Sequence, residues 1–470
     1  MSAPATTEKK YLKWYQKLAY GSGDLASNCS YGLVSSFVLL YLTGTLGLDS
    51  AIIGSLMLAS KVLDGISDVI FGTLIDRTHS KLGKARPWML FGQVGVSLCL
   101  FLLFAIPAGS TTMQYIYFFI VYTALNAVFY TANGIAYSSL VALITKNNNE
   151  RVQLGSFRFM FTVVTNIFMG FAVTGMVEKF GSGAAGWRTT ALIFAIVGLV
   201  VNIISCLAVK ELPEEELSDN TSEAAEEGKA VAKEKKHGFA ETAKILIHNK
   251  YYLMILAIYI VYYIMSNLTT GAGVFCATYY WGDGSLLGQF SMMKMFPVII
   301  ALAIAPVLIK KTGSMQKVNF WGYAISSVLG IPMIYFAMQK NLSMFLLFMF
   351  IKGIFAGTLS GSLNALIAEA SGYTTRTTGI HMDGMMYSCS SLGVKVGGGI
   401  GTAAVGWLLK LGGFVGTATV QSESAIRMIF NLYITFPFVI GIIITVLLAF
   451  LDVEKANKKW DAEHQKEAQA

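Results

Sequence analysis

The sequence predicts an all-α membrane protein with twelve transmembrane helices arranged in two six-helix bundles. Of its 470 residues, 54% are hydrophobic and only 13% are charged, whereas a soluble globular chain has about 25% charged residues. We count twelve apolar segments long enough to cross a bilayer, with one charged stretch between the sixth and the seventh. These observations favour a polytopic membrane protein over a soluble enzyme.

The apolar segments divide the chain into two halves. They cover residues 17–44, 50–76, 87–107, 113–145, 153–177, 188–209, 247–282, 287–310, 318–338, 343–370, 378–411 and 426–451. Residues 211–246 are charged and poor in apolar side chains, which predicts a partly helical or disordered linker. We therefore expect an N-terminal bundle over residues 1–210, a cytoplasmic linker over 211–246, and a C-terminal bundle with a cytoplasmic tail over 247–470. Lys and Arg gather at the even-numbered connections and the termini, which predicts that both termini are cytoplasmic.

Composition and motifs exclude several other classes of protein. The net charge of +8 fits basic loops that face anionic lipid, and it does not indicate nucleic-acid binding. The five cysteines are scattered without paired spacing, so we expect neither a disulfide framework nor a zinc site. The sequence contains no phosphate-binding loop and no nucleophile elbow, so we expect no ATP hydrolysis, no enzyme activity and no cofactor.

The second segment contains three charges in an otherwise apolar stretch. Lys61, Asp64 and Asp68 are spaced i, i+3, i+7, so they share one face of a helix. Two carboxylates four residues apart lie ~6 Å from each other and repel by about 3 kcal/mol at an effective dielectric of about 20. The pair therefore favours one additional positive charge, either a proton or a monovalent metal ion. The alternative interpretation is a structural clamp, in which Lys61 neutralises Asp64 and Asp68 bonds to a neighbouring helix.

The same segment and the loop after it carry a specific pattern. The charged face reads (Lys/Arg)-x-x-Asp-x-x-x-Asp, and it is followed by Gly72-x-x-x-Asp76-Arg77 and by Gly83-Lys84-x-Arg86-Pro87-Trp88. This pattern resembles the glycoside-pentoside-hexuronide:cation symporter family of melibiose-permease-like carriers, within the major facilitator superfamily. The resemblance implies the major facilitator fold, in which two six-helix halves are related as parallel repeats. It also implies a cation site at Asp64 and Asp68, which is a metal site if the ion is Na⁺, with Thr131 and Ser67 adding oxygens.

Polar residues in the first, fourth and fifth segments match the sugar-binding positions of the family. Tyr20-Gly21-x-x-Asp24 matches a motif whose carboxylate contacts sugar hydroxyls, and Asn28 shares its face. The alternative role for Asp24 is an interhelical partner of a basic residue. Arg158 matches an arginine of the sugar site; it can hold hydroxyls or a carboxylate and can neutralise Asp24, and the alternative is that it reaches towards the cytoplasmic interface.

The fourth segment also departs from the family pattern. Gly134 stands where the family has an acidic or amide residue, and Asn133 beside it can substitute only if the helix turns locally. The aromatic rings of Tyr130 and Tyr137 suit stacking on a pyranose ring, and ordinary packing explains them equally well.

The second half contributes two further groups of residues. In the eleventh segment, Ser391 and Lys395 match a sugar-adjacent hydroxyl and the intramembrane lysine of the family. The stretch around Glu369, Tyr373 and Asp383 resembles the family's cytoplasmic gate. We assign these three residues, with Lys61, Asp76 and Arg77, to a charge network or gate.

The function that these features imply is cation-coupled symport, driven by Na⁺ or H⁺, of a sugar, glycoside, glucuronide or xyloside across the plasma (inner) membrane by alternating access. The expected partners are the small-molecule solute and the lipid bilayer, and the expected state is a monomer. Two alternatives stay open. One is a carrier of lipids, other amphiphiles or organic anions on the same fold, and the other is a solute sensor that does not transport.

Overall fold

The computed structural model describes residues 9–213, 245–380, 383–418 and 420–467. The described chain divides into two compact units. The first contains residues 1–48 and 59–236, and the second contains residues 49–58 and 237–470. The predicted linker over 211–246 lies mostly outside the described residues, so its predicted state stays a prediction.

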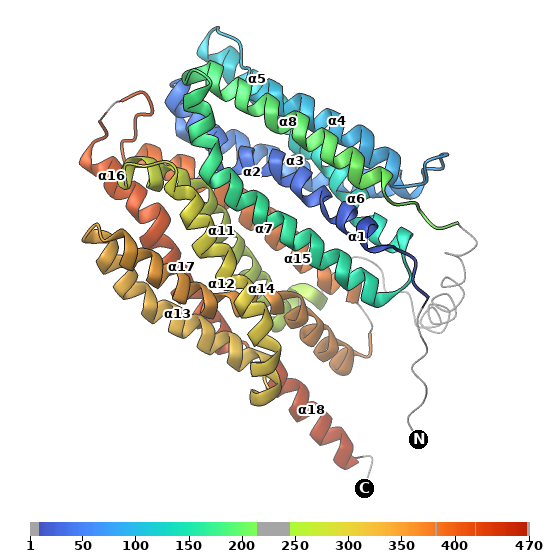
Figure 1. The fold of residues 1–470 in the computed structure, drawn as a ribbon. Coiled ribbons are helices and arrows are strands. Elements are labelled where there is room, and N and C mark those ends of the chain that lie inside the picture. Colours follow the sequence, from blue (N-terminus) through green and yellow to red (C-terminus); the bar gives the residue numbers. More distant parts are fainter. Residues whose placement is uncertain (1–8, 214–244, 381–382, 419, 468–470) are drawn as a thin grey trace. The chain divides into compact units, whose positions relative to one another are not determined.

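The first unit is a bundle of long helices (Figure 1). Its elements are α1 (Trp14–Gly21), α2 (Gly23–Leu40), η1 (Tyr41–Thr45), α4 (Arg86–Leu103), α5 (Thr111–Thr123), η2 (Ala124–Tyr130), α6 (Thr131–Ile144), α7 (Asn148–Lys179) and α8 (Gly183–Leu207). Helix α3 (Ser50–Asp76) begins in the second unit and continues into the first. Helix α2 packs against α7 and α8, and α4 packs against α8 and α6, so the polar faces of α2 and α7 lie together.

The second unit is also helical. Its elements are α11 (Lys250–Phe275), η3 (Cys276–Tyr280), α12 (Leu286–Thr312), α13 (Met315–Met338), α14 (Leu342–Thr378), α15 (Asp383–Leu411), α16 (Glu423–Phe430), η4 (Asn431–Thr435), α17 (Phe436–Phe450) and α18 (Val453–Glu467). Helix α11 packs against α15, and α14 packs against α12 and α13. The close approach of α11 and α15 depends on small residues, since a Cβ added at Gly397 would lie 2.4 Å from the Ile260 carbonyl oxygen.

Every predicted apolar segment overlaps one of these helical stretches. Within the described residues, eleven helices are long and apolar enough to cross a membrane. Helix α3 accounts for the remaining predicted segment. Its 27 residues are long enough to span a bilayer, and they contain Lys61, Asp64 and Asp68.

Short π-helical segments interrupt four of the predicted spans, a feature that the apolar pattern did not predict. In a π-helix the backbone bonds from residue i to i+5, and such segments are frequent at functional sites. The one that bears on function is η2, because it ends directly before Thr131.

The C-terminal tail and the start of the linker both contact the bundles. Helix α18 packs against α14, and Asn457 donates to the Glu369 carboxylate at 2.9 Å. In the first unit, the Glu211 carboxylate accepts the backbone N–H groups of Lys84, Ala85 and Arg86 at 2.7 to 3.0 Å. Glu211 therefore caps the N-terminus of α4, where a negative charge is favourable.

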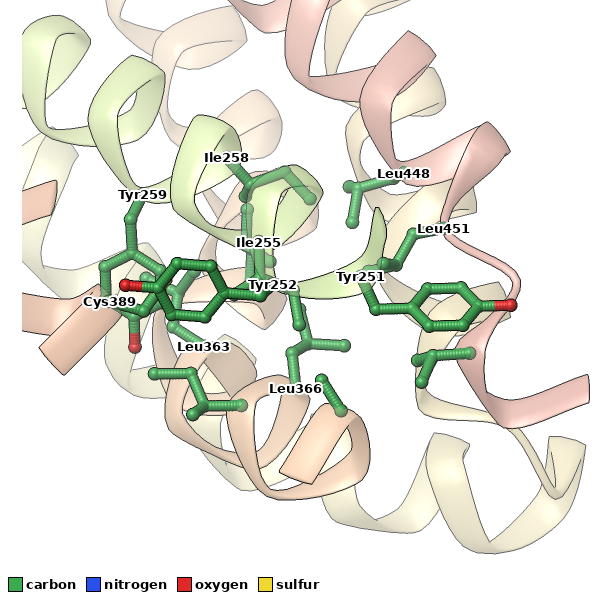
Figure 2. Close-up of a cluster of buried hydrophobic side chains, with 14 of the residues drawn as sticks. Tyr251, Tyr252, Ile255, Ile258, Tyr259, Leu363, Leu366, Cys389, Leu448 and Leu451 are labelled. Atoms are coloured by element: carbon green, nitrogen blue, oxygen red, sulfur yellow. The ribbon is translucent and has the colours of Figure 1, made fainter. Parts of the chain in front are cut away.

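A cluster of buried apolar side chains stabilises one end of the second unit (Figure 2). Tyr251 and Tyr252 diverge from neighbouring positions of α11, and Ile255 and Ile258 follow them into the cluster against Leu residues of α14 and α17. The hydroxyl of Tyr259 donates to Asn364 Oδ1 at 2.8 Å. This cluster joins α11, α14, α15 and α17, and two of these helices, α14 and α15, carry the predicted residues of the second half.

Asp49 and Lys410 form an ion pair within the second unit, with Nζ 2.6 Å from Oδ2. The Asp49 carboxylate also accepts the N–H groups of Ala51 at 2.9 Å and Ile52 at 3.3 Å, at the start of α3. Burial alone would raise the pKa of Asp49, but the hydrogen bonds from Lys410 and from the two N–H groups outweigh it and hold the pKa below its ordinary value.

The depressed pKa of Asp49 predicts a pH-dependent contribution to stability. It is present above the ordinary pKa of the carboxyl and is lost as the pH falls through the lower pKa of the folded state. We expect Asp49→Asn to lower the free energy of unfolding at pH 7 by at most about 1 kcal/mol, because Lys410 is 58% exposed. Thermal unfolding of the purified protein between pH 3 and pH 7 measures this.

Asp49→Ala serves as the comparison variant. It also removes the helix cap, so it should cost about 1 kcal/mol more than Asp49→Asn. A difference between wild type and Asp49→Asn that stays constant down to pH 3 would contradict the assignment.

Candidate functional site

Asp64 lies between a hydroxyl and an ammonium group in the first unit. Its Oδ1 accepts a hydrogen bond from Thr131 Oγ1 at 2.7 Å, and its Oδ2 lies 3.7 Å from Lys61 Nζ. The side chains of Lys61 and Asp64 are 17% and 14% exposed. At 3.7 Å the ion pair is longer than a charge-assisted hydrogen bond. The contact between Lys61 and Asp64 is the one expected if the two residues form a structural clamp.

The Thr131 hydroxyl has two acceptors and one proton. Its Oγ1 lies 2.7 Å from Asp64 Oδ1 and 2.9 Å from the carbonyl oxygen of Asn126. A hydroxyl donates once and offers two lone pairs, so it can satisfy only one of these two oxygens at a time. If the proton goes to Asn126, the Thr131 oxygen faces the Asp64 carboxylate with lone pairs. This arrangement suits a cation placed between the two oxygens.

The π-helix η2 creates this arrangement. The N–H of Thr131 bonds to the carbonyl oxygen of Asn126, five residues earlier, and the side chain of Thr131 bonds to the same oxygen. The resulting turn places Thr131 at the start of α6 with its hydroxyl towards α3.

An aromatic group lies beside the same carboxylate. The Lys61 ammonium lies 5.7 Å from the centroid of the Tyr31 ring, within the range of a cation–π interaction. The Tyr31 ring stacks on Tyr130 with centroids 5.4 Å apart. Tyr130, a predicted sugar-stacking residue, therefore belongs to the surroundings of Lys61 and Asp64. Sequence reasoning did not select Tyr31.

Ser67 and Asp68 occupy the next turn of α3. Both are half-buried, whereas Val69 and Ile70 on the other side of the helix are 73% and 52% exposed. The hydroxyl of Ser67 donates to the backbone oxygen of Asp64 at 2.9 Å. The polar residues of α3 therefore lie on a more buried side of the helix than the exposed apolar residues Val69 and Ile70.

Asp24 of α2 and Arg158 of α7 form a second ionic group. Arg158 Nε lies 2.6 Å from Asp24 Oδ2, and its Nη2 lies 3.5 Å from Oδ1. The guanidinium carbon lies 4.3 Å from the centroid of the Tyr137 ring. The side chains of Arg158 and Asp24 are 26% and 16% exposed. Arg158 therefore contacts Asp24 and Tyr137, and Asp24 has the basic interhelical partner that the alternative interpretation required.

A line of amides and hydroxyls continues from this pair along α2 and α7. Asn28 Nδ2 donates to Thr162 Oγ1 at 3.3 Å and to the Asp24 backbone oxygen at 2.7 Å. Asn166 Nδ2 donates to Asn28 Oδ1 at 3.1 Å. Sequence reasoning selected Asn28 and Arg158 but missed Thr162 and Asn166. The spacing 158, 162, 166 is i, i+4, i+8 and marks one helical face, so the signal was present in the sequence.

Asn133 does not take the place that the sequence suggested for it. Its side chain is 2% exposed, and its amide donates to the Met89 carbonyl oxygen at 2.7 Å and lies 3.5 Å from Asn202 Oδ1. Asn133 thus bonds α6 to α4 and α8. A Cβ at Gly134 would meet no atom within 4 Å, so there is open space beside Gly134.

The predicted residues of the second unit lie on two helices. Lys395 and Ser391 are on α15, half-buried and exposed respectively. Glu369 bonds to Asn457 of α18, and Tyr373 meets Tyr251 edge to face with centroids 4.8 Å apart. The side chain of Asp383 lies outside the described residues. In the first unit, Asp76 and Arg77 are exposed at the end of α3.

Comparisons with known proteins agree with the motifs. The chain is 27% identical to the isoprimeverose transporter of Lactiplantibacillus pentosus, with 100% of this chain and 96% of the relative covered. It is 24% identical to the putative glycoside/cation symporter YagG of Escherichia coli, with 95% and 93% covered.

A solved structure shows the same fold. The bacterial homologue of the human lysosomal transporter Spinster aligns with a TM-score of 0.65 at 12% identity, covering 95% of this chain and 97% of that one. The family described as MFS/sugar transport protein matches residues 19–455. The chain is therefore a multi-pass membrane protein with the major facilitator fold that belongs to the MFS/sugar transport protein family, the family of the glycoside-pentoside-hexuronide:cation symporters that its motifs resemble.

Proposed function

We propose that this protein uses a monovalent cation gradient to take up a glycoside-like sugar across the plasma membrane. The observation that carries the proposal is the intramembrane carboxylate of Asp64 facing the Thr131 hydroxyl, whose single proton serves two acceptors. A charge at this depth is costly unless it is paired or functional. A bound cation removes the conflict, because the hydroxyl then donates to Asn126 and its lone pairs point to the ion.

Asp64, Asp68 and Thr131 are the proposed ligands of the ion, with Ser67 at the edge of the group. Oxygen ligands suit Na⁺, and the same carboxylate can instead accept a proton. The Lys61 ammonium beside Asp64 means that the ion competes with an internal cation. Displacing Lys61 from Asp64 is therefore a step by which ion binding can change the local structure.

Asp24 and Arg158 are the proposed anchor of the sugar, and Tyr137, which is 2% exposed and packs on Tyr20, supports Arg158 with its ring. A carboxylate accepts bonds from adjacent sugar hydroxyls, and an arginine donates to ring or hydroxyl oxygens. The longer of the two Asp24–Arg158 contacts leaves Oδ1 the better placed oxygen for a solute hydroxyl. The names of the relatives, isoprimeverose transporter and glycoside/cation symporter, support this solute class. Ser391 and Lys395 of α15 stay predictions from the family resemblance.

Coupling needs only a modest interaction between the two ligands. If cation and sugar each favour the state that closes over both, a reciprocal coupling of about 1–3 kcal/mol suffices. Alternating access through rocking of the two bundles then moves both ligands together. We place the protein in the plasma membrane with both termini in the cytoplasm, because Lys and Arg gather at the even-numbered connections. A monomer is the expected state.

Uptake into proteoliposomes tests the proposal. We expect an imposed Na⁺ or H⁺ gradient to drive accumulation of at least one member of a panel of galactosides, xylosides, glucuronides and sulfonated sugars above the external concentration. Reversing the gradient is the control and should drive efflux. Accumulation of a labelled amphiphile and of no glycoside would instead indicate an amphiphile carrier, and binding without accumulation would indicate a sensor.

A further inference from the structure

A cavity within the second unit contains two lysines that the transport mechanism does not use. Its volume is about 180 Å³, and it is lined by residues of α11, α12, α13, α14, η4 and α17. Lys294 of α12 and Lys352 of α14 both lie in its wall. Both side chains are half-buried by the surrounding protein.

Neither lysine is matched by a carboxylate. Lys294 Nζ donates to Thr270 Oγ1 at 3.2 Å, and Thr270 donates its own proton to the Ser266 carbonyl oxygen at 2.9 Å. No Asp or Glu occurs among the described residues that line the cavity. The sequence from Tyr251 to Ala368 contains a single acidic residue, Asp283, which lies in the loop between η3 and α12.

Two ammonium groups in a cavity of low polarity create a strong preference for an anion. Moving a charge out of water is unfavourable unless an opposite charge or several dipoles replace the water. Thr270 supplies one acceptor to Lys294, and each ammonium has three donors. An anion that reaches both lysines would therefore find donors already in place.

The rest of the wall indicates what else the ligand must have. Met265, Met293, Met349 and Phe345 supply a flexible, apolar surface. The hydroxyls of Tyr262 and Ser360 in the same wall are 2.8 Å apart and bond to each other, so they do not require a polar ligand. The wall fits a body that is apolar rather than rich in hydroxyls.

We propose that this cavity binds an organic anion, with its carboxylate, sulfonate or phosphate group at Lys294 and Lys352 and its apolar body against the methionines and Phe345. The same chemistry is available from a soluble organic acid and from the head group of an anionic lipid. None of the residues assigned to the cation or the sugar is among the described residues that line this cavity, so the proposal can be tested with variants that leave those residues unchanged.

Binding to the purified full-length protein in a neutral detergent tests this site. The probes are benzenesulfonate and benzenesulfonamide, which have nearly the same shape and differ in charge. We expect isothermal titration calorimetry to show at least tenfold tighter binding of the sulfonate. Lys294→Gln and Lys352→Gln should each reduce that binding at least tenfold, because each removes a hydrogen bond to a charged group.

Lys310→Gln is the matched control, because Lys310 lies on the same helix as Lys294 but is exposed; it should leave the affinity unchanged. Lys352→Met tests whether a loss of binding is caused by unfolding of the variant. It should raise the melting temperature without ligand, because it removes an unmatched charge, and should abolish the stabilisation by benzenesulfonate.

Short-chain lipids separate the two sources of the anion. If dioctanoyl phosphatidylglycerol displaces benzenesulfonate and dioctanoyl phosphatidylcholine does not, the site accepts a lipid head group. If neither lipid displaces it, the site selects soluble anions. Equal binding of the sulfonate and the sulfonamide, or binding that survives both glutamine substitutions, would overturn the proposal.

Discussion

Replacing Asp64 by asparagine should abolish cation-driven accumulation of the solute while the protein still folds and inserts. Asparagine keeps the shape and can still accept the Thr131 hydroxyl, but it has no negative charge to hold a cation. A potential of 100 mV supplies about 2.3 kcal/mol per charge, which corresponds to about 50-fold accumulation when one charge moves with each solute. For the Asp64→Asn protein we expect this ratio to fall to one in proteoliposomes with an imposed potential. Asp68→Asn should also abolish accumulation.

The control for the loss of charge is Glu178→Gln, which neutralises an exposed carboxylate at the end of α7 in the same unit. It should leave the accumulation ratio unchanged. An Asp64→Asn protein that still concentrates the solute would remove the cation site from the mechanism. Equal loss in Glu178→Gln would show that the net charge of the first unit, and not the site, controls transport.

Thr131→Val distinguishes between the two candidate ions. The substitution keeps the branched shape and removes the oxygen that faces Asp64 at 2.7 Å. A metal ion would lose a ligand, so we expect the Na⁺ concentration for half-maximal uptake to rise at least tenfold if the ion is Na⁺. A proton needs no second oxygen, so H⁺-driven uptake should change little. Thr131→Ser restores the oxygen and should restore Na⁺-driven uptake.

The sequence predicted the membrane-spanning segments well. The thickness of the bilayer requires about 20 mostly apolar residues in each span, and such stretches are recognised directly in a sequence. Helix α3 differs from the other spans because it contains Lys61, Asp64 and Asp68. These charges make the helix less apolar than an ordinary span, and they also mark the position of the candidate ion site. The π-helical segments could not be predicted in this way. A π-helical segment shifts the backbone hydrogen bonds to residues five apart but leaves the apolar content of the segment unchanged. The pattern of apolar residues therefore does not reveal η2 before Thr131.

Partners across helices were harder to predict than the residues themselves. The intramembrane charges of Asp24, Asp64 and Arg158 are conspicuous in an apolar chain, and each was selected. Asn133 could not be assigned from the sequence, because a neighbour in sequence points to a different side of a helix and lies 100° away from Gly134 on the helical wheel. Its amide bonds to Met89 of α4, a contact that depends on how α6 packs and not on any local pattern.

Replacing Asp24 by asparagine should weaken both the fold and the binding of solute, and the two effects can be separated. Arg158 would lose the carboxylate 2.6 Å from its Nε and would keep an unpaired charge at a largely buried position. Removing one partner of a buried ion pair costs about 3–5 kcal/mol, so we expect a clear fall in melting temperature. Solute affinity should fall about tenfold or more, because a sugar hydroxyl loses a charged acceptor.

The double variant Asp24→Asn with Arg158→Gln distinguishes a solute anchor from a purely structural pair. Removing both charges leaves no unpaired ion, so much of the lost thermal stability should return. If Asp24 binds the solute, its affinity measured by calorimetry should stay low in this stabilised protein, while cation binding should stay close to wild type. Recovery of solute affinity together with stability would mean that Asp24 and Arg158 only hold α2 against α7, because binding would then depend on the packing of these helices and not on the carboxylate.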